Sequence, residues 1–240
     1  MMSHRAAQTC RGSLALALAF AARIVLADGV VVDRMYEPYV QPLETELEFR
    51  SVTQHNTETP DVQKQLLGLG RSLTDRIAVE VYAIGTHGKD EDLSIDSTEI
   101  EVKWQLTEQG EYAVDWGLLF ELEREFEDNA WEASTSILTT RDLGRWTGTA
   151  NLDFIYEWGS GIDNEFETTL HLQMRYRYRE AFEPGFEFHA GQDTIAAGPV
   201  LTGLYRIATG HKLRWSLGAF TGLDNVSPDN IVRANLEYEF

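Results

Sequence analysis

Positively charged residues are scarce in this sequence of 240 residues. It contains 20 Lys and Arg against 39 Asp and Glu, which gives a formal net charge of −19. Proteins that bind nucleic acids need basic patches to neutralise phosphate groups, so a nucleic-acid partner is excluded. Cysteine is also nearly absent: the single Cys10 cannot build the disulfide framework of many small secreted soluble domains.

The sequence lacks an apolar run long enough to cross a bilayer as a helix. The apolar stretch 13–22 is too short for that, and Arg23 ends it. It follows a basic opening and precedes Val25-Leu26-Ala27, which offers small residues to a signal peptidase. Residues 1–27 are therefore predicted to be a cleaved signal peptide. Cleavage would remove three arginines and no acids, so the mature charge becomes −19 − 3 = −22.

What the sequence does contain, from Leu43 to the carboxyl end, is a recurring alternation of apolar and polar residues. The clearest run is residues 146–158, where Trp, Gly, Ala, Leu, Phe, Tyr and Trp alternate with mostly polar residues. Successive side chains of a β-strand point to opposite faces, so the pattern predicts an all-β chain of about twelve strands. Connections after even strands are expected to be short turns, such as Gly144 and Pro184-Gly185. Those after odd strands are mostly longer and acidic.

The final strand carries a family resemblance. Val232, Ala234, Leu236, Tyr238 and Phe240 occupy every second position, and the chain ends on the aromatic residue. This resembles the closing strand of Gram-negative outer-membrane β-barrels. The resemblance implies one transmembrane antiparallel barrel in the outer membrane, surrounded by its lipids. It also implies that the barrel assembly machinery reads the C-terminal strand.

Alternation alone also fits a soluble β-sandwich with its apolar face inward. About twelve strands, however, enclose a barrel too wide to fill with apolar side chains. Trp146 and Tyr156 are ten residues apart, about 33 Å along a strand, and a tilt of about 40° projects this to the roughly 25 Å lipid-facing band. We therefore expect the apolar face to point outward. The resulting divisions are the signal peptide 1–27, a periplasmic lead-in 28–42 and the barrel 43–240. The lead-in has the alternative of entering the barrel mouth.

Two sets of candidate residues follow from the strand pattern. The predicted lumen-lining residues lie on the polar face: Glu44, Glu46, Glu48, Arg50, Glu80, Glu99, Glu101, Lys103, Asp115, Asp153, His171, Arg175, Arg177, Arg179, Arg214, Arg233 and Glu237. The predicted membrane-girdle residues are aromatic and lie near strand ends: Trp146, Tyr156, Trp158, Phe166, Tyr176, Tyr178, Tyr238 and Phe240.

The lumen charges admit two interpretations. Arginines on residues 175–179 face glutamates on residues 44–48, 80 and 99–101 across the ring, which would create a transverse field that selects solutes. Alternatively, the same residues pair with each other and close the interior.

Enzyme and metal signals are weak. No His occupies a predicted lipid-facing position, His171 points inward, and no G-x-S-x-G elbow occurs. No H-x-x-x-H or C-x-x-C spacing is present, so no metal or cofactor is predicted. The sequence predicts a small monomeric, porin-like channel for polar or ionic solutes. The alternatives are a closed barrel with a structural or surface-interaction role and, ranked third, an outer-membrane lipid hydrolase.

Overall fold

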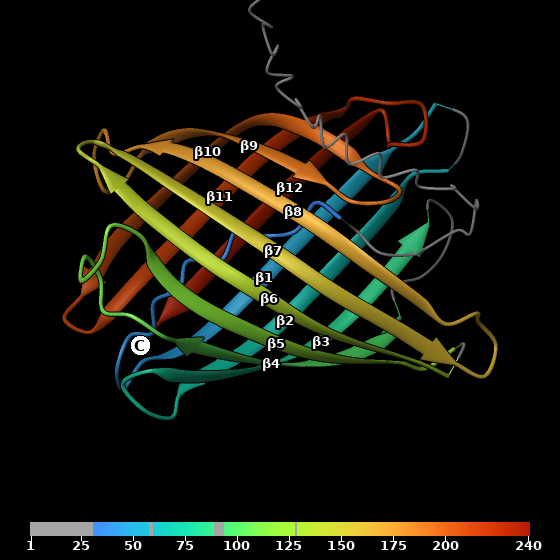
Figure 1. The fold of residues 1–240 in the computed structure, drawn as a ribbon, viewed down its shortest axis with the longest axis horizontal. Helices are drawn as coiled ribbons and strands as arrows, with labels where there is room; N and C mark the ends of the chain where they lie inside the picture. The colour runs from blue at the N-terminus through green and yellow to red at the C-terminus, as the bar shows by residue number, and fades with distance from the viewer. Residues whose placement is uncertain (1–30, 58–59, 89–93, 128) are drawn as a thin grey trace, which may run out of the picture.

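The computed structural model describes residues 31–57, 60–88, 94–127 and 129–240, which include one closed ring of antiparallel strands (Figure 1). Each strand pairs with its sequence neighbours, and β1 pairs with β12 to close the ring. This confirms the predicted twelve-stranded barrel, whereas the predicted signal peptide lies outside the described residues. The strands are β1 (Thr45–His55), β2 (Val62–Ser72), β3 (Ile77–Gly88), β4 (Ser97–Gln105), β5 (Asp115–Glu125), β6 (Ala130–Leu143), β7 (Trp146–Gly159), β8 (Glu165–Tyr176), β9 (Glu183–Ala190), β10 (Ile195–Ala208), β11 (His211–Gly222) and β12 (Asn230–Glu239). Within the described part of the chain, no helix has the length and apolar character needed to cross a membrane.

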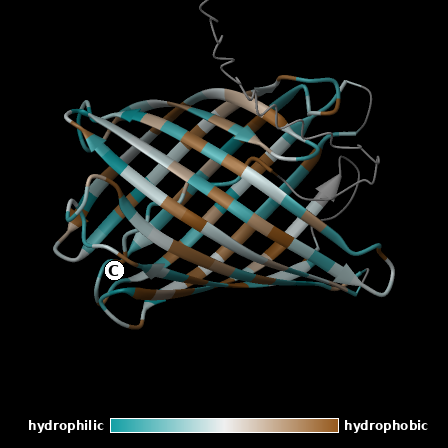
Figure 2. Ribbon diagram, in the orientation of Figure 1, coloured by the Kyte–Doolittle hydropathy of each residue, from teal (hydrophilic) through white to brown (hydrophobic). Residues whose placement is uncertain are grey.

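Burial alternates along the strands as the sequence pattern predicts. On β7, Thr147, Thr149 and Asn151 are buried, whereas Trp146 and Tyr156 are exposed. Figure 2 shows the same alternation as neighbouring brown and teal patches along the strands. Because most buried side chains are polar and many large apolar ones are exposed, the barrel has the reverse polarity of a water-soluble β-domain.

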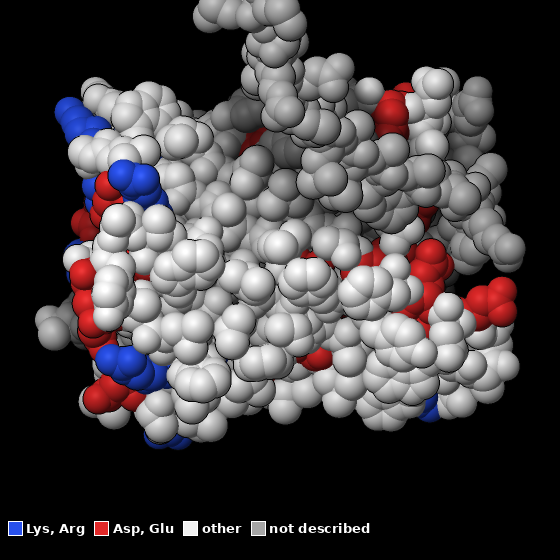
Figure 3. Space-filling model, in the orientation of Figure 1, with Lys and Arg blue, Asp and Glu red and all other residues white. Residues whose placement is uncertain are grey.

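The outer face is a band of exposed apolar side chains. Leu67 and Leu69 on β2 and Val81 on β3 are each more than half exposed. Lys and Arg gather mainly at the end of the barrel that holds the C-terminus, leaving a broad, mostly uncharged side between the two ends (Figure 3). An apolar surface this continuous would aggregate in water, so it is suited to hydrocarbon.

The two ends of the barrel differ in their connections. Residues 144–145 and 209–210 make two-residue turns at the end that holds the C-terminus, which we call the turn end. Gly144 and Gly210 have φ of +65° and +78° there, a conformation that favours glycine. The opposite end, the loop end, has no two-residue turn among the described residues. Short turns face the periplasm in bacterial barrels, so the expected outer-membrane location would place the turn end on that side.

The expected contrast between short turns and long loops holds only in part. The connection from β8 to β9 is residues 177–182, and Pro184-Gly185, predicted to be the turn, instead lie within β9. Gly185 pairs with Arg175 and Val200, so strand pairing on both sides outweighs the local turn preference of this dipeptide. The connection from β4 to β5 is also long, spanning residues 106–114.

An extended segment runs through the interior of the barrel. Residues 31–41, called the lumenal segment below, lie inside the ring (Figure 1). Val31 lies beside Gly191 at the loop end, and the Gln41 carbonyl accepts a hydrogen bond from Ser72 Oγ (2.5 Å) at the turn end. About eleven extended residues reach roughly 36 Å, enough to cross the lipid-facing band. The lead-in 28–42 was expected to lie in the periplasm or to enter the barrel mouth. The structure places its residues 31–41 along the whole lumen.

Candidate functional site

The lumenal segment has a two-residue period of its own. Val32, Arg34, Tyr36, Pro38 and Val40 are buried, and the residues between them are less so. Among the residues that the structure describes, no ladder of backbone hydrogen bonds joins the segment to a strand, so side chains of the wall must satisfy its backbone groups. The segment is thus held mainly by side-chain contacts.

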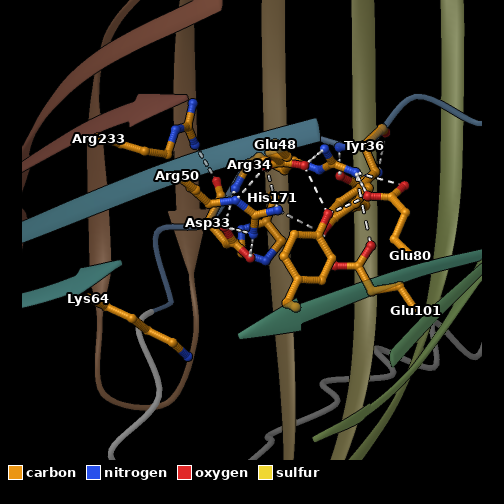
Figure 4. Close-up of polar contacts among 12 residues, drawn as sticks. Asp33, Arg34, Tyr36, Glu48, Arg50, Lys64, Glu80, Glu101, His171 and Arg233 are labelled. Atoms are coloured by element: carbon orange, nitrogen blue, oxygen red, sulfur yellow. Dashed lines mark hydrogen bonds and ion pairs between the residues drawn. The ribbon is translucent and has the colours of Figure 1, made fainter. Parts of the chain in front are cut away.

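The Arg34 guanidinium lies among four carboxylates from four strands. They are Glu48 of β1, Glu80 of β3 and Glu101 of β4, which are labelled in Figure 4, and Glu237 of β12. We call these four residues the carboxylate cage. Nη1 contacts Glu48 and is 3.5 Å from Glu237 Oε2, while Nη2 is 3.3 Å from Glu80 Oε2 and 3.9 Å from Glu101 Oε2. All five residues are buried. An unpaired buried charge is costly, so the guanidinium and the cage depend on each other.

Tyr36 completes the surroundings of Arg34 from within the segment. Its ring centroid is 4.3 Å from the Arg34 Cζ, a cation–π contact. Its hydroxyl donates a hydrogen bond of 2.7 Å to Glu101 Oε1. The segment therefore supplies a cation, an aromatic face and a donor at one point in the lumen.

Wall amides satisfy the backbone of the lumenal segment. The Tyr36 N–H donates to Asn151 Oδ1 (3.0 Å), and the Asn151 Nδ2 donates back to the Tyr36 carbonyl (2.9 Å). The Val40 N–H donates to Gln105 Oε1 (2.8 Å). Asn151 and Gln105 thus replace the missing strand partner at two heights of the barrel.

Asp33 joins the segment to the basic residues of β1 and β12. Its carboxylate accepts hydrogen bonds from Arg50 Nη1 at 2.5 and 2.6 Å, and its carbonyl accepts one from Arg233 Nη1. Arg233 Nη2 also donates to both Glu187 oxygens at 2.9 and 2.8 Å. The negative group of the segment therefore meets cations of the wall.

On the opposite side of the lumen, at the turn end, a second acid of the segment also pairs with a cation of the wall. Glu37 Oε1 is 2.5 Å from Arg175 Nη2, and Arg175 Nε is 3.0 Å from Glu183 Oε2. Within the described residues, the structure pairs the basic side chains of the lumen with carboxylates, while the acids outnumber them. Many of the pairs run through the lumenal segment rather than directly across the ring.

Two buried histidines form a chain of contacts between β7, β8 and β9. The Nδ1 atoms of His171 and His189 are 2.8 Å apart, His171 Nε2 is 2.8 Å from Asp153 Oδ2, and His189 Nε2 is 3.0 Å from Glu187 Oε2. In the contact between the two Nδ1 atoms one nitrogen donates and the other accepts, so the two rings orient each other between Asp153 and Glu187.

His171 lacks the geometry of a general base that activates a nucleophile. Thr169 Oγ1 lies 3.1 Å from His171 Nε2, the nitrogen that also contacts Asp153. In a hydrolase triad the acid and the nucleophile contact different ring nitrogens. This contact set therefore does not activate Thr169.

A cavity of about 310 Å³ occupies the turn-end half of the lumen, beside the lumenal segment. Glu44, which immediately precedes β1, borders it, and its Oε1 is 2.8 Å from Lys212 Nζ. Burial and a hydrogen bond with Glu239 raise the pKa of Glu44 to about 7, against the opposing effect of Lys212. Acids and bases both line the cavity, so it is suited to water and polar solutes.

Three carboxylates could hold a metal ion. Glu99, Glu101 and Glu121 each place an oxygen within 4.8 Å of the others, and carboxylate oxygens suit hard cations. Arg34 Nη2, at 3.9 Å from Glu101 Oε2, already supplies positive charge there. We assign no metal to this cluster.

Most of the predicted lumen-lining residues lie on the inner face or at its turn-end opening. These are Glu44, Glu46, Glu48, Arg50, Glu80, Glu99, Glu101, Lys103, Asp115, Asp153, His171, Arg175, Arg214, Arg233 and Glu237. Arg177 and Arg179 both follow the end of β8 at Tyr176. Arg177 still borders the cavity at the turn end and pairs with Asp142 (3.0 Å), whereas Arg179 is exposed in the connection.

The predicted girdle residues fall at both ends of the outer face. At the turn end, Trp146 packs on Tyr176 with ring centroids 4.9 Å apart, and Tyr238 stacks on Phe240 at 5.5 Å. At the loop end, Tyr156 stacks on Trp158 at 5.7 Å. Phe166 is exposed at the loop end, and Tyr178 is exposed just beyond β8.

Sequence reasoning missed Asp33, Arg34, Tyr36 and Glu37, which make the central contacts of the lumen. Their signal was the period of two in residues 32–40, which Pro38 and the charged residues hid. It also missed apolar residues that point inward, such as the cluster of Val32, Val52, Ala196, Phe220 and Ile231. These pack beside the segment near the loop end.

No family model matches the chain, and no curated protein matches it in sequence. Solved structures do match its fold. An outer-membrane channel of Pseudomonas putida F1, COG4313, has a TM-score of 0.57 and 14% identity, and the match covers 87% of this chain and 98% of that one. The KdgM porin in complex with disordered oligogalacturonate has a TM-score of 0.56 and 13% identity, with 81% and 99% covered.

A third match has a different role. The β domain of the Bordetella autotransporter BrkA has a TM-score of 0.52 and 13% identity, and the match covers 82% of this chain and all of that one (100%). The chain therefore has the fold of an outer-membrane β-barrel, as its last strand indicated.

Proposed function

We propose that this protein is an outer-membrane channel for polar or ionic solutes, and that the lumenal segment closes it in the state described. The observation that carries the proposal is a polar lumen filled by a segment without strand pairing. Ion pairs and side-chain hydrogen bonds hold that segment. When the whole segment leaves and water enters, both sets of charges become hydrated, so no charge is left buried and unpaired. A segment held in this way can leave the lumen without breaking the barrel.

The location follows from the outer face and the fold. The apolar band requires lipid, and the fold matches barrels named as porins and outer-membrane channels. We place the protein in the outer membrane of a Gram-negative bacterium, with its last strand as the signal for the barrel assembly machinery. The KdgM and COG4313 matches are channels rather than enzymes, and the His171 contacts give no support to a hydrolase.

The alternative is a closed barrel with a structural or surface-interaction role. It is favoured by how completely the middle of the lumen is filled: Arg50 and Glu187 have no exposed surface. The two functions differ in whether the segment moves. Ion current through refolded protein in a planar bilayer tests this directly.

Gly117 on β5 offers a way to displace the segment. A Cβ built at Gly117 would lie 2.8 Å from Pro38 Cβ and 3.0 Å from its Cα, so Gly117→Val should push the segment away. We expect channels of this variant to be open for a larger fraction of the recording time than wild-type channels. Gly148→Val on β7 is the control, because a Cβ there meets only Met174, at 3.6 Å or more.

A reversible lock makes the test sharper. Pro38→Cys combined with Gly117→Cys places two thiols where a shift of about 1 Å gives disulfide geometry, and the expected mature chain has no other cysteine. Current should disappear on oxidation and return with a reductant. A folded, heat-modifiable barrel that passes no current in the valine variant and in the reduced cysteine pair would establish the closed barrel instead.

A further inference from the structure

We propose that the carboxylate cage is a binding site for guanidinium and ammonium groups of solutes, and that Arg34 occupies it as an internal stand-in for such a solute. The inference rests on the proposed channel function. It names the class of solute, organic cations, for which the open lumen would be selective.

The cage belongs to the wall and is organised without the segment. Tyr82 on β3 donates its hydroxyl to Glu48 Oε2 (2.9 Å) and also contacts Glu80. Gly68 on β2 leaves room for that ring, since a Cβ there would come within 2.3 Å of Tyr82 Cε1. The wall thus fixes two of the four carboxylates before any cation arrives.

The wall alone cannot neutralise the cage. Arg50 Nη2 is 2.9 Å from Glu48 Oε1, Lys103 Nζ is 4.0 Å from Glu80 Oε1, and Arg214 Nε is 3.5 Å from Glu237 Oε1. These three cations face the four cage carboxylates and the neighbouring Glu46, Glu99 and Glu121. When Arg34 leaves, the site therefore carries excess negative charge.

The wider lumen has the same sign. Carboxylates in the inward register outnumber the Lys and Arg residues there. The acids are Glu46, Glu48, Glu80, Glu99, Glu101, Asp115, Glu121, Glu123, Glu125, Glu132, Asp153, Glu157, Glu165, Glu167, Glu183, Glu187, Glu237 and Glu239; the cations are Arg50, Lys64, Lys103, Arg175, Arg206 at the exposed rim, Lys212, Arg214 and Arg233. Such an interior concentrates cations and repels polyanions. This is the opposite of what an acidic sugar polymer would require.

The form of the occupied site indicates an organic cation rather than a metal ion. Glu237, Glu80 and Glu101 lie 3.3 to 3.9 Å from the two terminal nitrogens of Arg34, spread around a planar fork. Glu101 Oε2 is buried, accepts no hydrogen bond and faces Nη2 at the longest of these distances. A Ca²⁺ ion would need oxygens at about 2.3–2.6 Å. The cage instead matches donors carried on a flat group.

The test uses the full-length protein with Arg34→Ala and agmatine, which carries a guanidinium at one end and an ammonium at the other. Isothermal titration in detergent should show agmatine binding to Arg34→Ala at least tenfold more tightly than to wild type. Agmatine should also raise the unfolding temperature of the variant, because it returns a cation to the cage. Arg34→Gln is the second variant if Arg34→Ala does not fold.

Glu80→Gln with Glu101→Gln, added to either variant, should remove this binding. Glu183→Gln, a lumen carboxylate paired with Arg175, is the matched control and should leave it unchanged. Absence of agmatine binding, or binding that survives the double change in the cage, would overturn the inference. Because binding is measured without current, a barrel that binds agmatine but never conducts would reject the channel and keep the site.

Discussion

At the scale of single residues, Arg34 has the largest consequences for stability. Its guanidinium is 8% exposed and shared by four carboxylates, so the cost of burying it is offset only while all partners are in place. The cage in turn loses its central cation when Arg34 is changed. A buried pair of this kind is expensive to break from either side.

Arg34→Met keeps the length of the side chain but removes its charge. We expect it to lower the free energy of unfolding by about 3–5 kcal/mol, because the cage carboxylates stay buried without a counter-ion. Urea titration of the refolded barrel in lipid vesicles measures this. Arg206→Met is the matched control: its ion pair with Glu180 lies on the exposed rim and is screened by water, so the loss should be far smaller. Equal losses for the two variants would contradict the account of the cage.

Glu44 gives a pH dependence at the rim. Its folded pKa of about 7 lies above the ordinary 4.5, so the folded state holds this proton more tightly than the unfolded state. Its contribution to stability is therefore present below pH 4.5 and is lost as the pH rises through 7. Glu44→Gln should flatten that part of the stability curve between pH 5 and 8. A wild-type curve that falls no more steeply than that of the variant in this window would refute the assignment.

At the scale of elements, β2 is shaped by two inward glycines. A Cβ at Gly68 would collide with the Tyr82 ring, and one at Gly70 would lie 2.7 Å from Glu46 Cγ and Glu80 Cγ. At these two positions β2 has no inward side chain, which leaves room for side chains of β1 and β3. The alternation of β2 is weaker in sequence for the same reason.

Gly68→Ala should therefore disturb the cage from a distance. We expect a loss of about 1–3 kcal/mol in unfolding free energy, because the Tyr82 ring must move from its place beside Glu48. Gly148→Ala, on the lipid face, is the control and should change little. Tyr82→Phe combined with Gly68→Ala separates the two effects: if the ring itself is displaced, removing its hydroxyl should add little to the loss.

At the scale of the whole molecule, the seam between β1 and β12 closes the ring. Thr45 and Phe240 exchange backbone hydrogen bonds of 3.0 and 2.8 Å there, so the last residue of the chain is also the last link of the seam. The aromatic side chain of Phe240 faces outward and stacks on Tyr238. Closure and the proposed assembly signal thus meet in one residue.

Removal of Phe240 should reduce the amount of folded protein in the outer membrane several-fold, with unfolded chain accumulating in the periplasm. Heat-modifiable mobility of membrane fractions measures this. Phe166→Ala, another exposed aromatic but at the loop end, is the comparison and should assemble nearly normally. Similar loss in both variants would mean that aromatic area, rather than the C-terminal position, governs assembly.

The strands of the barrel wall were predicted from the sequence far better than the lumenal segment that fills the barrel. The two faces of a strand such as β7 can be recognised from its alternating polar and apolar residues, because one face contacts lipid and the other lines the lumen. Arg177 and Arg179 keep that alternation past the end of β8, and nothing local shows that pairing stops at Tyr176. The lumenal segment follows no sheet, and its partners, such as Asn151 for Tyr36, are distant in the chain. Contacts between residues so far apart in the chain cannot be predicted from the spacing of residues along the sequence.

The direction of the lumenal segment sets a condition on biogenesis. The chain passes from the loop end to the turn end before β1 begins. Its earliest described residues therefore lie at the end opposite the one proposed to face the periplasm, where the proposed assembly machinery would receive the chain. Two orders of assembly are compatible with this path. Either the strands pair and close around a lumenal segment that is already in place, or the N-terminal end passes through a barrel that has already closed. A bulky folded tag fused ahead of Val31 would distinguish these orders, since only the first tolerates cargo too large for the bore.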